Sequence, residues 1–314
     1  MAKQKPHFSQ RRYILLLALL VMVLYVVIPQ LGSFRSSWQL LGRLNFAWVA
    51  VAVTATFLTY LAAAGTYYFL ALKPLRYGQL ILIEMTAMFV NRLLPAGIGA
   101  LGTNYAYLRQ RCHSQSQAAT VVAANNLTGV AGHLTITAIT LAAYGPAYLK
   151  LFWHQWAFSH IFLKSILVLA VVLAVILGRK FIASALESIR RPVYSYLAMP
   201  HKLIYALITS MILTLCNLFC LEACSLALGV HVPFIAILVV FSFGLGAATA
   251  TPTPGGLGGF EAGLFGGLVA YHVASPTALA LVLLYRLVSF WLPLIAGGMA
   301  LAVAQRKKLF NGYI

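Results

Sequence analysis

Five ionisable side chains stand in long apolar stretches of a 314-residue chain in which only 8% of the residues are charged. They are Glu84, Arg92, Glu222, Glu261 and Arg286. A charged group inside a membrane is costly and usually serves a substrate or ion pathway. A guanidinium is always charged and binds phosphate through paired hydrogen bonds, so Arg286 and Arg92 predict a site for a phosphate headgroup. Glu261 could neutralise Arg286 when that site is empty, or bind an amine or a proton.

Two Gly/Pro-rich stretches interrupt apolar sequence beside these residues. The stronger, residues 251–263, reads TPTPGGLGGFEAG, and the weaker, residues 91–104, reads NRLLPAGIGALGTN. Proline lacks a backbone donor and glycine disfavours a helix interior, so each stretch should break a helix. The residues expected to form the breaks are Pro95, Gly97, Gly99, Pro252, Pro254, Gly255, Gly256, Gly258 and Gly259. Helix N-termini after such breaks offer free N–H groups and a positive dipole end, which also favour an anion.

Two asparagines complete the predicted headgroup site. When the halves of the chain are aligned on Pro95 and Pro254, Asn125 and Asn126 fall at the level of Arg286. The last helix of each half would then present polar groups at the same level, toward the breaks. The alternative is that these asparagines form hydrogen bonds between neighbouring membrane helices.

A structural role is also an alternative for the ionisable residues, which could form ion pairs that hold a helix bundle together. The pairs would be Arg286–Glu261 and Arg92–Glu84. A structural or packing role is the favoured interpretation for Glu84, Glu222, His133 and His272.

The composition predicts an all-α polytopic membrane protein. The chain is 62% hydrophobic and carries 22 Lys and Arg residues against four acidic residues, all of them Glu, for a net charge of +18. Nucleic acid is not the expected partner, because most of the cations lie in short segments between apolar runs, which is the positive-inside pattern of membrane proteins. We expect a membrane-embedded protein whose partner is membrane lipid, because a basic inner face attracts anionic headgroups.

The apolar runs predict about six full spans and two broken, re-entrant hairpins in a single domain covering residues 1–314. The expected spans are 13–31, 46–72, 118–144, 160–178, 203–228 and 276–303, with hairpins around the two breaks. Most cations then fall on one side, in segments 1–12, 73–76, 109–111, 179–202 and 306–308, which places both termini in the cytoplasm. Each half would have three crossings and one hairpin, so residues 13–144 and 160–303 would form an inverted repeat.

Signatures of catalysis are poor. The sequence has no HExxH, P-loop or GxSxG motif and no Asp, and we expect no catalytic residue, cofactor or metal. Cys216, Cys220 and Cys224 share one helix face, where packing is the favoured interpretation and a soft metal site the alternative.

Two motifs carry a resemblance to a known family. PTPGGLGGFEA at residues 252–262, followed by ALALVLLYRL at 278–287, resembles the lysylphosphatidylglycerol synthase transmembrane region, and NRLLPAGIG at 91–99 is similar to that family's first broken segment. In bifunctional members this region is a flippase for aminoacylated phospholipid, attached to a cytosolic aminoacyltransferase domain. The resemblance implies a stand-alone member in the bacterial inner membrane, with a flippase-like fold and a lipid-moving role. The family's pattern falls on Glu261, Gly255, Gly256, Gly258, Gly259 and Arg286.

The favoured function is therefore a flippase or transporter for a phosphate-bearing lipid, anionic or polyprenyl-linked. One alternative is an integral membrane enzyme that modifies lipid headgroups with Glu261 as the base. Another is an accessory subunit that anchors a lipid-modifying or glycosyl-transferring enzyme through the basic segment 179–202.

Overall fold

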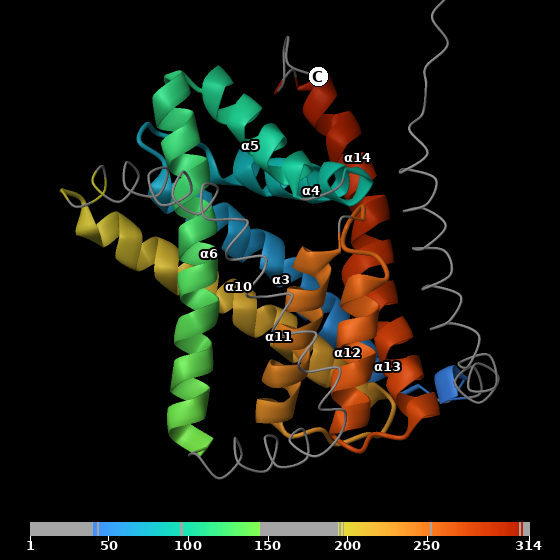
Figure 1. The fold of residues 1–314 in the computed structure, drawn as a ribbon. Coiled ribbons are helices and arrows are strands. Elements are labelled where there is room, and N and C mark those ends of the chain that lie inside the picture. The colour runs from blue at the N-terminus through green and yellow to red at the C-terminus, as the bar shows by residue number, and fades with distance from the viewer. Residues whose placement is uncertain are drawn as a thin grey trace, which may run out of the picture.

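The computed structural model describes residues 40–42, 44–94, 97–144, 194, 196, 198–251, 253–307 and 309. The predicted spans 13–31 and 160–178 and the break residues Pro95 and Pro252 lie outside these residues. The described residues form helices joined by turns and short connecting segments (Figure 1).

Two long antiparallel helices, α3 (Phe46–Leu70) and α10 (Pro200–Ala227), cross the centre of the bundle. Hydroxyl and thiol groups join them along their length, with Thr56 Oγ1 3.2 Å from Cys220 Sγ and Thr66 Oγ1 3.0 Å from Thr209 Oγ1. Small residues permit this approach, since a Cβ on Gly65 would stand 3.0 Å from the Thr209 methyl group. The last turn of α3 therefore lies beside the first turns of α10, and the start of α3 lies beside the end of α10.

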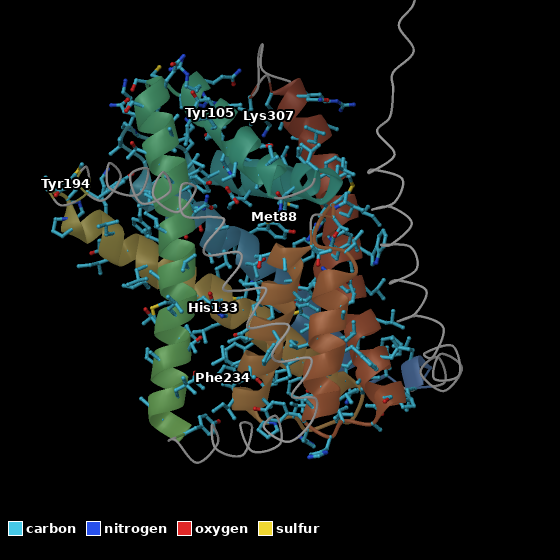
Figure 2. The ribbon with its side chains drawn as sticks, in the orientation of Figure 1. Met88, Tyr105, His133, Tyr194, Phe234 and Lys307 are labelled. Carbon is cyan, nitrogen blue, oxygen red and sulfur yellow. The ribbon has the colours of Figure 1, made fainter. Side chains whose placement is uncertain are left out.

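Each central helix leads into a helical hairpin. The first consists of α4 (Tyr77–Leu93) and α5 (Ile98–Gln110), and the second of α11 (Phe234–Ala250) and α12 (Gly259–Ala270). Because α3 and α10 are antiparallel, the two hairpins begin at opposite ends of the bundle. Figure 2 shows this separation, with Phe234 in the lower part of the view and Tyr105 at the top.

A long helix follows each hairpin. The first is α6 (Gln115–Tyr144). The second is one continuous rod made of α13 (Ser275–Arg286), a π-helical turn (Leu287–Trp291) and α14 (Leu292–Arg306). The α4 arm of the first hairpin packs closely on α14, since a Cβ atom on Gly297 would stand 2.7 Å from the Met85 carbonyl oxygen. Segments from the two halves of the chain are thus packed into one another.

The predicted breaks occur at glycines in the left-handed region. Gly97 (φ 75°) immediately precedes α5 and Gly258 (φ 86°) immediately precedes α12. Gly97 and Gly258 thus occupy the same position relative to the helix that follows them. Alignment of the two halves on Pro95 and Pro254 instead pairs Gly97 with Gly256. The two-residue difference arises because the second break contains a longer turn, with Gly255 and Gly256 also at positive φ.

Among the described residues, four helical segments are long and apolar enough to cross a membrane: Phe46–Leu70, Gln115–Tyr144, Pro200–Ala227 and Ser275–Arg306. They correspond to four of the predicted spans. The hairpin arms have 17, 13, 17 and 12 residues, fewer than the ~20 that a full crossing requires. The chain is therefore an all-helical, multi-pass membrane protein.

Candidate functional site

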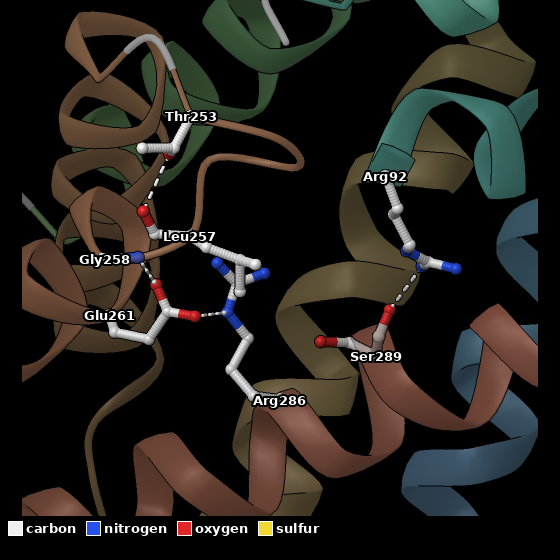
Figure 3. A network of polar contacts seen from close by, with 7 residues as sticks. All are labelled: Arg92, Thr253, Leu257, Gly258, Glu261, Arg286 and Ser289. Carbon is white, nitrogen blue, oxygen red and sulfur yellow. Dashed lines mark hydrogen bonds and ion pairs between the residues drawn. The ribbon is translucent and has the colours of Figure 1, made fainter. Parts of the chain in front are cut away.

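An ion pair joins the second hairpin to the last helix (Figure 3). Arg286 Nε lies 2.6 Å from Glu261 Oε1, and the two side chains are 11% and 27% exposed. The second carboxylate oxygen, Glu261 Oε2, accepts a 2.8 Å hydrogen bond from the Gly258 backbone N–H. Glu261 therefore ties the first turn of α12 to Arg286, and its charge also faces the positive end of the helix dipole.

Aromatic rings flank the Arg286 guanidinium on two sides. Its central carbon is 4.4 Å from the centre of the Phe260 ring and 5.1 Å from that of the Phe290 ring. Phe260 also stacks on Tyr285, with ring centres 5.9 Å apart and an interplanar angle of 13°. Contacts of this kind are worth about 0.5–2 kcal/mol each, and they hold the guanidinium plane in a fixed orientation.

A second arginine reaches the same Phe290 from the first hairpin. Arg92, in the last turn of α4, places its guanidinium carbon 5.0 Å from the Phe290 ring centre. Its Nη2 donates a 2.7 Å hydrogen bond to the Ser289 carbonyl oxygen. Arg92 and Arg286 thus lie against one phenylalanine, although 194 positions separate them in the sequence.

The Ser289 carbonyl is available because of a proline. In an α-helix this carbonyl would accept from the N–H of residue 293, but Pro293 has no N–H. The helix adjusts by forming the π-turn Leu287–Trp291, in which Leu292 N–H bonds to the Leu287 carbonyl. Such turns are frequent at functional sites, and this one presents a backbone oxygen to Arg92.

The two breaks meet at this point. A Cβ on Gly255 would lie 2.6 Å from the Phe290 ring and 3.5 Å from the Arg92 Cα. Only a residue without a side chain fits here, and its φ of 61° also favours glycine. Within the second break, Thr253 Oγ1 donates a 2.7 Å hydrogen bond to the Leu257 carbonyl, which closes the turn (Figure 3).

Guanidinium nitrogens of both arginines are buried without a hydrogen-bond partner among the described residues. They are Arg92 Nη1 and Arg286 Nη2. Buried donors of this kind are expensive to leave unpaired. The cluster also contains two arginines and one carboxylate, that of Glu261, so it keeps one net positive charge. Its geometry and charge suit an anion with several oxygen acceptors, such as a phosphate.

The two asparagines predicted to join the headgroup site form no hydrogen bond with this cluster. The side chains of Asn125 and Asn126 on α6 make no recorded polar contact with Arg92, Glu261 or Arg286, and Asn126 is exposed. Their role in headgroup binding therefore stays a prediction.

The suggested ion pair between Arg92 and Glu84 is wrong, because Arg92 turns to Ser289 instead. Glu84 is buried (4% exposed) near the Asn104 amide, with its Oε1 unpaired within the described part of the chain. His133 fulfils the packing role predicted for it, since its Nε2 lies 3.0 Å from Ser242 Oγ and joins α6 to α11.

Sequence reasoning missed Phe260, Phe290 and Ser289. Phe260 directly precedes Glu261, and Phe290 follows Arg286 by one helical turn, so an aromatic one position before or four positions after a membrane charge was a usable signal. Pro293 inside an apolar span was the signal for the π-turn and for the free Ser289 carbonyl.

Comparison with known proteins connects this architecture to a family. Residues 13–297 match the family described as the lysylphosphatidylglycerol synthase TM region, which covers the described helices from α3 into α14. No curated protein matched the chain. The family associates the chain with membrane-lipid function. On this match, the protein belongs to the lysylphosphatidylglycerol synthase TM region family.

Proposed function

We propose that this protein is a flippase or transporter that moves a phosphate-bearing lipid, anionic or polyprenyl-linked, across the bacterial inner membrane. The observation that carries the proposal is the position of Arg92 and Arg286 against Phe290. Two fixed guanidinium groups, one neutralising carboxylate and two unpaired buried donors form a receptor for a phosphodiester rather than a balanced structural ion pair.

The arrangement of the hairpins supports movement between leaflets. The hairpins begin at opposite ends of the bundle and their breaks meet where Gly255 approaches Arg92. We propose that both hairpins are re-entrant and that residues 13–144 and 160–303 form an inverted repeat, with both termini in the cytoplasm. A site between two such repeats can open alternately to either side when one repeat rocks against the other.

Glu261 has a specific part in this cycle. A bound phosphate would compete with the Glu261 carboxylate for Arg286, because both are oxygen anions that the guanidinium binds in the same way. Glu261, which is partly exposed, would then take up a proton or pair with a cation until the phosphate leaves. Because the phosphate replaces the Glu261 carboxylate and is later replaced by it, Arg286 keeps an anionic partner throughout. A buried arginine without such a partner would be costly.

The test is lipid movement in proteoliposomes. Phospholipids labelled at the headgroup are offered to the wild-type chain, Arg286→Ala and Glu261→Gln, and headgroup accessibility is followed in both leaflets with and without a proton gradient. Arg306→Ala is the matched control, since Arg306 is an exposed arginine in the last turn of the same helical rod. We expect movement in wild type and Arg306→Ala, and a loss of at least about tenfold in the two site variants.

A different result would redirect the assignment. Wild-type protein that binds but never moves any tested lipid would contradict transport. That outcome would favour a headgroup-modifying enzyme, or an accessory subunit for a lipid-modifying or glycosyl-transferring enzyme. Retained movement in Arg286→Ala would remove the cluster from the pathway.

A further inference from the structure

A separate cavity lies at the end of the bundle where α3 stops and α10 starts. Its volume is about 520 Å³, and it is formed by the end of α3, the connecting residues 71–75 and the first turns of α10. Its lining includes Tyr68, Phe69, Lys73, His201, Lys202 and Tyr205. This volume is in the range of sites that hold small ligands. The Arg286 cluster contributes no residue to it.

The cavity is cationic. Lys73, His201 and Lys202 all line it, and none of its lining residues within the described part of the chain is acidic. A pocket with this charge favours an anion, and lysine ammonium groups bind phosphate as point charges. The cavity thus favours an anionic ligand, and a phosphate group is one that its lysines can bind.

Contacts from three segments hold these cations in place. Lys202 Nζ donates to the Ala71 carbonyl oxygen and Tyr196 Oη to that of Leu70, so both cap the end of α3. The backbone N–H of Lys73 donates a 3.2 Å hydrogen bond to Nε2 of His113, from the loop after α5. The connecting segment that carries Lys73 is therefore anchored, while the Lys73 side chain itself is exposed.

The surroundings indicate that the anion is a lipid. The cavity is at the end of two candidate membrane spans, and its rim carries the exposed rings of Tyr68 and Tyr205, which are typical of the membrane–water interface. Ile208 and Ile212 follow Tyr205 at three and seven positions, on the same helix face, and both are exposed. Apolar surface thus runs from the cationic cavity along α10, where an acyl chain would lie.

We propose that this cavity binds the headgroup of an anionic phospholipid at the membrane interface, as a second lipid site apart from the Arg286 cluster. Lys73 and Lys202 hold the phosphate, Tyr68 and Tyr205 surround the glycerol region, and the acyl chain follows Ile208 and Ile212. The bound lipid bridges the end of α3 and the start of α10. This proposal stands whether or not the protein moves lipid.

Lipid binding to the full chain tests this site directly. Phosphatidylglycerol, phosphatidylcholine, glycerol phosphate and inorganic phosphate are titrated onto the detergent-solubilised protein, and bound ligands are counted by native mass spectrometry. The test variant is Lys73→Glu, and Lys307→Glu is the control because Lys307 is an exposed lysine directly after α14 that does not line the cavity. Both are repeated with Arg286→Ala, which removes binding at the central cluster.

We expect phosphatidylglycerol to bind more tightly than phosphatidylcholine in the wild type and in Arg286→Ala. Lys73→Glu should weaken phosphatidylglycerol binding at least about tenfold in both backgrounds, while Lys307→Glu should leave it unchanged. Unchanged thermal midpoints would show that the variants are folded. Equal loss in both lysine variants would overturn the site in favour of general surface attraction. Glycerol phosphate or inorganic phosphate binding as tightly as the lipid would overturn the lipid assignment.

Discussion

At the scale of single residues, Arg286 has an environment that sets charge, orientation and partner at once. Glu261 balances its charge, Phe260 and Phe290 fix its plane, and one nitrogen stays unpaired. A lysine in this position would keep the charge but would lose the planar fork and the stacking on both rings. Charge and geometry can therefore be separated experimentally.

Arg286→Lys should fold and still lose activity. We expect lipid movement in proteoliposomes to fall at least about tenfold, with a thermal midpoint close to that of the wild type, because the ion pair with Glu261 can persist. Activity near the wild-type level would show that positive charge alone suffices and that the contacts with the Phe260 and Phe290 rings are only structural.

His113 should make the protein sensitive to acid. It is buried in the loop between α5 and α6, its Nε2 accepts the Lys73 N–H, and its Nδ1 faces the Arg111 carbonyl, a pattern that a neutral ring satisfies. Burial lowers its pKa, and the nearby Lys73 and Lys202 act in the same direction. Below the unfolded value of about 6.5, the unfolded chain binds the proton more readily than the folded one, so stability falls as pH decreases.

The measurement is the thermal midpoint of wild type and His113→Gln between about pH 7.5 and about pH 5.5. Glutamine keeps an acceptor for Lys73 but does not titrate in this range. We expect the wild type to lose more stability across the interval than the variant does. Parallel curves would mean that other groups cause the acid sensitivity.

At the scale of elements, the last helix is built around an irregular turn. Pro293 removes one donor, the π-turn Leu287–Trp291 absorbs the irregularity, and the Ser289 carbonyl is left to bond with Arg92. The first hairpin is thereby connected to the rod that carries Arg286. The element would be more regular without the proline, but it would lose the acceptor for Arg92.

Pro293→Ala should change stability and activity in opposite directions. The new N–H can pair with the Ser289 carbonyl in the α-helical pattern and compete with Arg92. We expect an unchanged or higher thermal midpoint, since proline disfavours a helix interior, together with reduced lipid movement. Pro200→Ala, in the first turn of α10 where the N–H has no helical partner, is the control. Full activity in Pro293→Ala would show that the Arg92 contact is dispensable.

At the scale of the whole molecule, antiparallel packing of α3 and α10 decides where the hairpins begin. Asn45 N–H bonds to the Ala227 carbonyl at one end, and the Phe69 and Tyr205 rings meet at the other, 5.1 Å between centres. The first hairpin starts at the Tyr205 end and the second at the Ala227 end. In the proposed topology, the two hairpin bases face opposite sides of the membrane.

Cysteine labelling tests that topology. Cys112, exposed in the loop after α5, should react with a membrane-impermeant maleimide only from the cytoplasm. A cysteine at position 272, introduced as His272→Cys into a chain without other cysteines, should react only from outside. Labelling of both cysteines from the same side of the membrane would contradict the inverted repeat.

The sequence by itself determined the class of this protein, the helices of its described part and the charged residues of the candidate site. Low charge and long apolar runs require helices in lipid, because backbone groups must be satisfied within the chain. Proline and glycine fixed the breaks, since their effects on the backbone are local. The same locality allowed Arg92, Glu261 and Arg286 to be singled out as costly membrane charges.

Only the tertiary structure decided which of these residues meet. Arg92 was expected to pair with Glu84 if its role were structural, yet it lies against Phe290 and Ser289, on a helix almost two hundred positions away in the numbering. Counting residues from the breaks predicts Asn125 at the level of Arg286, but no hydrogen bond joins the two side chains in the described part of the chain. Residue spacing along one helix gives the level and the face at which a side chain lies. Contact between helices depends instead on how closely small residues such as Gly65 and Gly255 let the backbones approach. That approach is set by the packing of the whole bundle.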